Sequence, residues 1–137
     1  MSRVISLRLK DDQAAQLDRL ARQFERSPSA TAALLLAEKL TEEQFPCLEF
    51  RDTILGRELF VKGTRLKIWQ VVMVARGYGM DAARVAKELM APAQGIESAL
   101  AYAEANPDEI NRILEEVESF TFEDLKRIVP WAKKALE

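Results

Sequence analysis

The N-terminal residues alternate in a way that can place ligand-contacting side chains on one face of a β-strand. Ile5, Leu7 and Leu9 form an apolar set, and Val4, Ser6 and Arg8 lie between them on the opposite face. A ribbon of two such strands fits the DNA major groove, where Arg donates two bonds to guanine and Ser bonds either base type. We therefore predict DNA contacts from Arg3, Val4, Ser6 and Arg8.

The residue types that carry most enzymatic and metal chemistry are missing or isolated. The chain has no His, which is the commonest general base and metal ligand, and its single Cys, Cys47, has no nearby base pattern. Its five Gly residues stand singly at turns and form no phosphate-binding loop. We expect neither enzymatic activity nor a metal or cofactor site.

Two predicted helices follow the strand and complete a unit of only about 40 residues. Asp11 and Asp12 offer N-caps for the first helix, and Ser27 caps the second, with Pro28 at its first position. Since the strand has no pairing partner within the unit, a second copy has to supply one. The start of the second helix, Ser27 and Ser29, suits phosphate.

This order of strand, helix, Ser-Pro-Ser turn and helix resembles the ribbon-helix-helix family of dimeric DNA-binding proteins over residues 3 to about 42. The resemblance implies that positions 4, 6 and 8 read bases and that the second helix clamps phosphate at its start. The alternative is a dimerisation module that never touches DNA.

A second unit begins after an acidic segment that contains Pro46. Residues 50–62 are predicted to form two short strands about Gly56, and Gly63 and Thr64 are predicted to shape the following turn. Three helices follow: one from Ile68 to Arg76, one over residues 81–90 capped by Asp81, and one from Pro92 to Asn106. These are helix-turn-helix proportions.

Residues 50–110 resemble the family catalogued as domain of unknown function four-three-three, found among VapB-type antitoxins. The resemblance is carried by the strings VKGTRLKIWQV, GYGMDAARVAKEL and IESALAYAEANPDE. It implies a small winged or homeodomain-like helical unit encoded beside a PIN-like ribonuclease toxin. Candidate contacts to phosphate or to the toxin are Arg65, Lys67, Arg84 and Lys87. The alternatives are a structural ion pair that ties the hairpin to the helices, for Arg65, and a solvated helix face, for Arg84 and Lys87.

The C-terminal residues combine negative charge with apolar side chains. A helix is predicted from Asp108 to Ser119, and a second from a capping box at residues 121–124 until Pro130 ends it. Candidate anchors for a toxin are Phe120, Phe122, Ile128 and Trp131. Packing of this tail within the chain, or across the dimer, is the alternative.

The near-neutral total charge conceals separate charged segments. Residues 1–40 carry seven basic and five acidic side chains, and residues 51–90 carry eight and four, whereas residues 91–137 carry five basic and ten acidic. We therefore expect different segments to meet different partners. The predicted divisions are a DNA-binding domain over residues 1–43, a linker over 44–49, a helix-turn-helix-like domain over 50–109 and a tail over 110–137.

The sequence as a whole predicts a mainly α fold with short β elements: an N-terminal ribbon-helix-helix and a small helical unit with a β-hairpin. The expected function is that of an antitoxin that neutralises a PIN-like toxin and represses its own operator as a homodimer. The alternative is a dimeric interaction scaffold, or a regulator without a toxin. A single thiol and the lack of a leader or a long apolar run predict a cytoplasmic protein without membrane contact.

Overall fold

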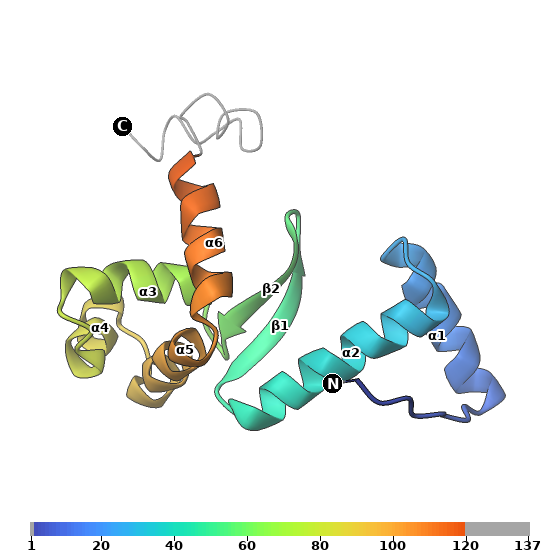
Figure 1. The fold of residues 1–137 in the computed structure, drawn as a ribbon. Coiled ribbons are helices and arrows are strands. Elements are labelled where there is room, and N and C mark those ends of the chain that lie inside the picture. The colour runs from blue at the N-terminus through green and yellow to red at the C-terminus, as the bar shows by residue number, and fades with distance from the viewer. Residues whose placement is uncertain (1, 120–137) are drawn as a thin grey trace. The chain divides into compact units, whose positions relative to one another are not determined.

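The computed structural model describes residues 2–119, which are mainly helical with one two-stranded antiparallel sheet (Figure 1). The chain forms two compact units, Met1–Gln44 and Phe45–Glu137. The predicted fold class, mainly α with short β elements, is confirmed at this level. Within the described range no helix combines the length and the apolar character that crossing a membrane requires.

The first unit contains α1 (Asp11–Gln23) and α2 (Pro28–Gln44). The prediction that Asp11 and Asp12 cap α1 is wrong, because both lie in its first turn and Lys10 occupies the N-cap position. The amide of Lys10 donates to the side-chain oxygen of Gln13 at 3.1 Å. The two carboxylates still lie at the positive end of the helix dipole, which favours negative charge.

α2 begins as predicted and extends further. Ser27 Oγ accepts a hydrogen bond from the amide of Ala30 at 3.1 Å, and Pro28 is the first helical residue, where no N–H is needed. The helix continues to Gln44 and the next strand starts at Leu48, so residues 45–47 alone join the two elements. The predicted linker over 44–49 is therefore shorter than expected.

The second unit opens with a hairpin of β1 (Leu48–Thr53) and β2 (Gly56–Val61). The strands are antiparallel, with Leu48 opposite Val61 and Thr53 opposite Gly56. Gly56 has a φ of +110°, which glycine adopts far more readily than other residues, and it directly follows the turn at Ile54 and Leu55. The two predicted strands are thus present.

The Gly63-Thr64 turn after the hairpin is held by the hydroxyl of Thr64. This group donates to the carbonyl of Val61 at 2.8 Å and accepts from the amide of Leu66 at 3.0 Å. Gly63 has a φ of +78°. The predicted roles of both residues in shaping this turn are confirmed.

Four helices follow within the described residues: α3 (Ile68–Gly77), α4 (Ala82–Leu89), α5 (Ala93–Ala105) and α6 (Pro107–Ser119). Asp81 caps α4 as predicted, since its carboxylate accepts from the amides of Ala83 and Arg84 at 3.1 and 3.3 Å. Asn106 ends α5. These helices and the hairpin enclose the core, whose most completely buried members include Leu48, Val61, Val71, Val85 and Ile96.

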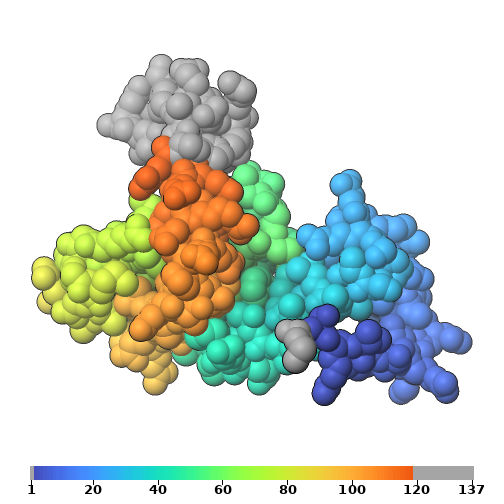
Figure 2. Space-filling view, in the orientation of Figure 1, coloured from blue at the N-terminus to red at the C-terminus, as the bar shows by residue number. Residues whose placement is uncertain are grey.

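α6 is an integral part of this second unit. Ile110 and Leu114 are only 3% and 4% exposed and belong to the same apolar cluster as the residues of α3 and α5. In the space-filling view, α6 (orange) borders α3 (yellow-green) (Figure 2). Residues 110–119 of the predicted tail therefore pack within the chain, which was one of the two alternatives for that segment.

Candidate nucleic-acid and partner interfaces

The N-terminal segment, residues 2–10, is exposed along its whole length and forms neither helix nor strand in the single chain. The predicted base readers Arg3, Val4, Ser6 and Arg8 all lie in it, and Val4 is 93% exposed. Within residues 2–119 neither Arg3 nor Arg8 has an ion pair or a side-chain hydrogen bond. Both guanidinium groups are therefore available to a ligand, while the strand pairing itself stays a prediction.

The apolar side chains of the first unit are also uncovered. Ile5, Leu7 and Leu9 are 64%, 71% and 42% exposed, and Leu36 and Leu40 of α2 are 50% and 61% exposed. In the described part of this unit Ala21 is the one buried apolar residue. Exposed aliphatic side chains in such number are typical of a surface that binds another molecule, so this unit is a candidate interface.

The start of α2 is less free to bind phosphate than the sequence suggests. The side chain and the carbonyl of Ser27 accept hydrogen bonds from the amides of Ala30 (3.1 Å) and Thr31 (2.9 Å). Ser27 is thus committed to its own helix, whereas Ser29 is exposed at the second helical position. Both side chains are exposed, but among the described residues only that of Ser29 makes no hydrogen bond.

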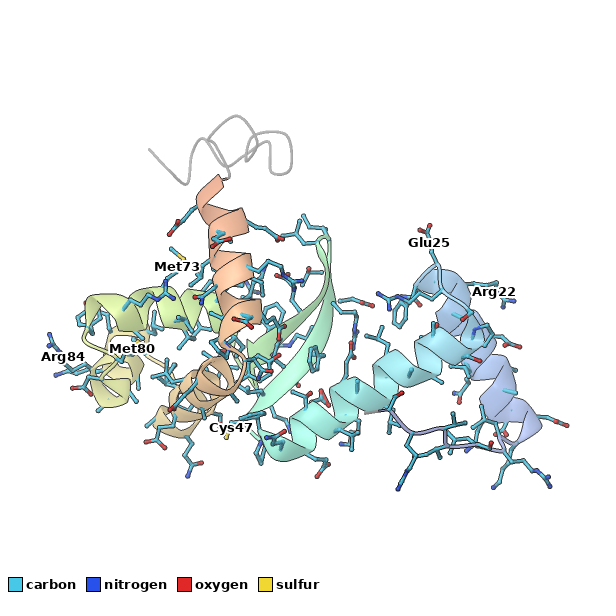
Figure 3. The ribbon with its side chains drawn as sticks, in the orientation of Figure 1. Arg22, Glu25, Cys47, Met73, Met80 and Arg84 are labelled. Carbon is cyan, nitrogen blue, oxygen red and sulfur yellow. The ribbon has the colours of Figure 1, made fainter. Side chains whose placement is uncertain are left out.

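The four cationic candidates of the second unit have different surroundings. Lys67 Nζ lies 2.9 Å from a carboxylate oxygen of Glu58 and 5.9 Å from the centre of the Trp69 ring. The guanidinium of Arg84 lies 5.0 Å from the centre of the Tyr78 ring (Figure 3). Arg65 and Lys87 are exposed, and neither has an ion pair with another described residue. Lys67 is therefore largely satisfied internally, and the other three are more open to solvent.

Arg51, which sequence reasoning did not select, plays the structural role considered for Arg65. Its Nε donates to Glu49 at 2.8 Å, one Nη also pairs with Glu49, and the other Nη donates to the carbonyl of Thr64 at 2.6 Å. Its guanidinium also lies 4.5 Å from the centre of the Phe60 ring. Arg51 thus ties β1 to the turn that precedes α3. An Arg two residues after a Glu on the same face of a strand was the available signal.

A buried tyrosine links α5 to α6 and to the segment before β1. The hydroxyl of Tyr102 donates to a carboxylate oxygen of Glu109 at 2.7 Å, and its ring meets Phe45 edge to face with centroids 5.3 Å apart. Burial above all, and then the hydrogen bond and the negative charge of Glu109, raise the pKa of Tyr102 far above its ordinary value. The residue is a neutral hydrogen-bond donor at physiological pH.

An open groove of about 440 Å³ runs between α3, α5 and α6. Val72, Ala103 and Ile110 form buried parts of its lining, and the lining also includes Leu100, Met80 and Arg76. Across it, a terminal nitrogen of Arg76 donates to Asn111 at 3.1 Å. The groove is open to solvent and lined mainly by apolar side chains.

The predicted toxin anchors Phe120, Phe122, Ile128 and Trp131 lie outside the described residues. Within residues 2–119, no group of three or more His, Cys, Asp or Glu side chains is arranged to hold a metal ion. Comparison of the chain with protein-family models, with curated proteins and with solved structures found no match. The evidence for the candidate interfaces is therefore the exposure, charge and contacts of their own residues.

Proposed function

We propose that this protein is an antitoxin of a type II toxin-antitoxin system. In this proposal it dimerises through its N-terminal strands, binds its operator DNA as an autorepressor, and neutralises a PIN-like ribonuclease toxin. The observation that carries the proposal is the uncovered apolar set of the first unit, which a second copy can bury by pairing strand with strand.

Pairing of this kind also leaves the other face of the two strands exposed for contact with DNA. When the side chains of Ile5, Leu7 and Leu9 point into the dimer, alternation directs Val4, Ser6 and Arg8 outward from both copies. An antiparallel ribbon with two outward arginines matches the major groove and a palindromic operator. The unpaired state of Arg8 in the single chain supports this role.

A gel shift with the DNA upstream of the protein's own gene tests the DNA-binding part. Arg8→Ala should weaken binding by about 1–3 kcal/mol for each copy of the contact, and affinity should fall steeply with salt. Arg22→Ala is the matched control, since Arg22 is an exposed arginine in the last turn of α1 (Figure 3). Equal binding by the wild-type chain and Arg8→Ala, without salt dependence, would favour the scaffold alternative.

The toxin-binding part is supported by the resemblance of residues 50–110 to VapB-type antitoxins and by the acidic C-terminal third. Its test is co-expression of the chain with the product of the adjacent reading frame. We expect a small nuclease that co-purifies with the chain and loses its ribonuclease activity in the complex. A lone gene, or an adjacent product that fails to bind, contradicts this part without affecting the DNA-binding part.

A further inference from the structure

The groove between α3, α5 and α6 combines a buried apolar floor with exposed methionines on its rim. Val72 and Ile110 line it and are each only 3% exposed. Met80 also lines it and is 49% exposed, and Met73, three residues before the groove-lining Arg76 on α3, is 47% exposed (Figure 3). Methionine side chains are flexible and polarisable, so they adapt to the side chains that they meet. The groove therefore offers apolar surface that side chains of a partner can cover.

The helices that form the groove carry a large excess of negative charge. α5 and α6 together have seven acidic side chains, whereas the basic ones on α3, α5 and α6 are Arg76 and Arg112. Arg76 already donates to Asn111 across the groove at 3.1 Å. The electrostatic potential at the groove is therefore negative, which favours a basic ligand and disfavours nucleic acid and anionic lipid.

Five of these acidic side chains lie beside the groove. They are three, four or seven residues from Leu100 on α5 or from Asn111 on α6, both of which line the groove, so they lie on the same side of each helix. All five are exposed, and none has an ion pair or a side-chain hydrogen bond with another described residue. They are Glu97, Glu104, Asp108, Glu115 and Glu118.

We propose that this groove binds an amphipathic helix of a partner protein. Apolar side chains of that helix enter the groove, and lysine or arginine side chains beside them pair with the acidic residues of α5 and α6. The identification of this partner as the toxin rests on the proposed function, whereas the groove and its charge do not depend on it.

Methyl NMR of the full chain tests the proposal, because its four methionines report on different places. The probe is a synthetic amphipathic helix of leucine and lysine, and a soluble nitroxide measures the exposure of each labelled methyl group. In the free chain the nitroxide should broaden the signals of Met73 and Met80. The peptide should shift both signals and reduce their broadening several-fold. It should leave Met90, which is 93% exposed at the end of α4, unchanged.

Two variants of matched conformation place the contact. Met80 and Met90 have φ values of +61° and +53°, which asparagine tolerates better than most residues, so Met80→Asn and Met90→Asn should both fold. Met80→Asn removes an apolar side chain from the groove and should weaken peptide binding by roughly tenfold. Met90→Asn should leave the affinity unchanged.

Glu104→Lys tests the role of charge. The side chain of Glu104 is exposed, so the change leaves the core in place, and it should weaken peptide binding several-fold at low salt and less at high salt. Glu88→Lys makes the same change of charge at an exposed position of α4 outside the groove and should have a much smaller effect. A peptide with glutamate in place of lysine should not bind.

Three results overturn the proposal: a lysine peptide that does not bind, equal binding of the lysine and glutamate peptides, or binding that does not respond to Met80→Asn. Protection of Met80 from the nitroxide in the free chain also overturns it, since this chain or a second copy would then cover the groove.

The same NMR measurement with the product of the adjacent reading frame tests whether the partner is the toxin. A product that binds and protects Met80 supports this identification. A product that binds without affecting Met80 contradicts it and leaves the antitoxin function supported. A product that does not bind at all contradicts the antitoxin function, while the peptide measurements still decide whether the groove binds a basic helix.

Discussion

The two units of this chain differ in how far each one satisfies its own apolar side chains. The second unit buries side chains from β1, β2 and all four of its described helices in one cluster. The first unit has two helices of 13 and 17 residues, yet within its described residues it buries one apolar residue, Ala21, and exposes Leu36 and Leu40. Apolar content alone therefore does not indicate a self-sufficient core.

The reason lies in the distribution of apolar residues around α2. Leu34 and Leu35 are half-buried, while Leu36 and Leu40 are exposed, so leucines project from more than one side of this helix. Leucines on more than one side of a helix are typical of a helix that packs against more than one neighbour. The stability of the first unit should therefore depend on protein concentration, and that of the second should not.

Leu7→Glu should produce the largest effect, because it breaks the proposed cover of the first unit. Burial of a leucine contributes about 1.5–3 kcal/mol, and a twofold axis counts the loss twice, so the dimer dissociation constant should rise by roughly a hundredfold to ten-thousandfold. Sedimentation equilibrium at micromolar concentration measures this change directly.

Ser6→Glu is the matched control for that experiment, since it introduces the same charge on the opposite face of the strand. It should leave the dimer intact and remove DNA binding. A Leu7→Glu chain that dimerises as tightly as the wild type, or a wild-type chain that is monomeric, would show that the first unit does not need a second copy to cover its apolar side chains.

Gly95→Ala tests the closest approach inside the self-sufficient unit. A Cβ at position 95 would lie 2.5 Å from Cγ1 of Val61, a branched side chain that is 1% exposed and has little room to move. We expect a loss of about 1–3 kcal/mol in the free energy of unfolding, since overpacking outweighs the better helix propensity of alanine. Urea titration of the full chain gives the value.

Val61→Ala in the same chain supplies the control, because it removes the methyl group that the new Cβ meets. The double variant should be more stable than the sum of the two single losses implies. Additive losses would show that position 95 has space that the structure does not reveal.

Local signals along the sequence predicted much of the second unit. Asp81 as a cap, Gly63 with Thr64 at the turn and Asn106 at the end of α5 each follow from backbone chemistry within a few residues, and each is observed. The same local reasoning misplaced the start of α1. Lysine is not a preferred N-cap residue, yet Lys10 occupies the N-cap position, and its amide donates a hydrogen bond to the side chain of Gln13.

Local sequence signals did not predict contacts between residues that are far apart in the sequence. The pattern Gly63-Thr64-Arg65 drew attention to Arg65, yet the structural arginine is Arg51, which reaches Thr64 across thirteen positions. Likewise, the sequence of α6 predicts an acidic amphipathic helix, but it does not indicate whether the apolar face of that helix contacts this chain or another. The apolar face of α6 packs in the core because α3 and α5 lie against it.

Arg51→Ala should destabilise the second unit by about 1–3 kcal/mol, because it removes hydrogen bonds to Glu49 and Thr64 that involve a charged group. Arg65→Ala, which removes an exposed arginine without such contacts among the described residues, should change the free energy of unfolding by less than about 0.5 kcal/mol. Thermal unfolding of both variants compares the two positions. Equal losses would assign Arg65 the structural role that we give to Arg51.

Tyr102→Phe should destabilise the second unit less than Arg51→Ala at neutral pH, with a loss of about 1 kcal/mol from the hydrogen bond to Glu109. Its pH dependence is more informative. The pKa of Tyr102 is raised in the folded state above the ordinary 10.0, so its contribution is fully present below pH 10. Above pH 10 the unfolded chain loses this proton first, and stability falls by up to about 1.4 kcal/mol per pH unit.

The phenylalanine variant lacks this proton, so denaturant titrations between pH 9 and about 11 should show a shallower decline than in wild type. Parallel declines in the two proteins would mean that Tyr102 ionises as easily folded as unfolded, and that the core of the second unit is open to water at this point.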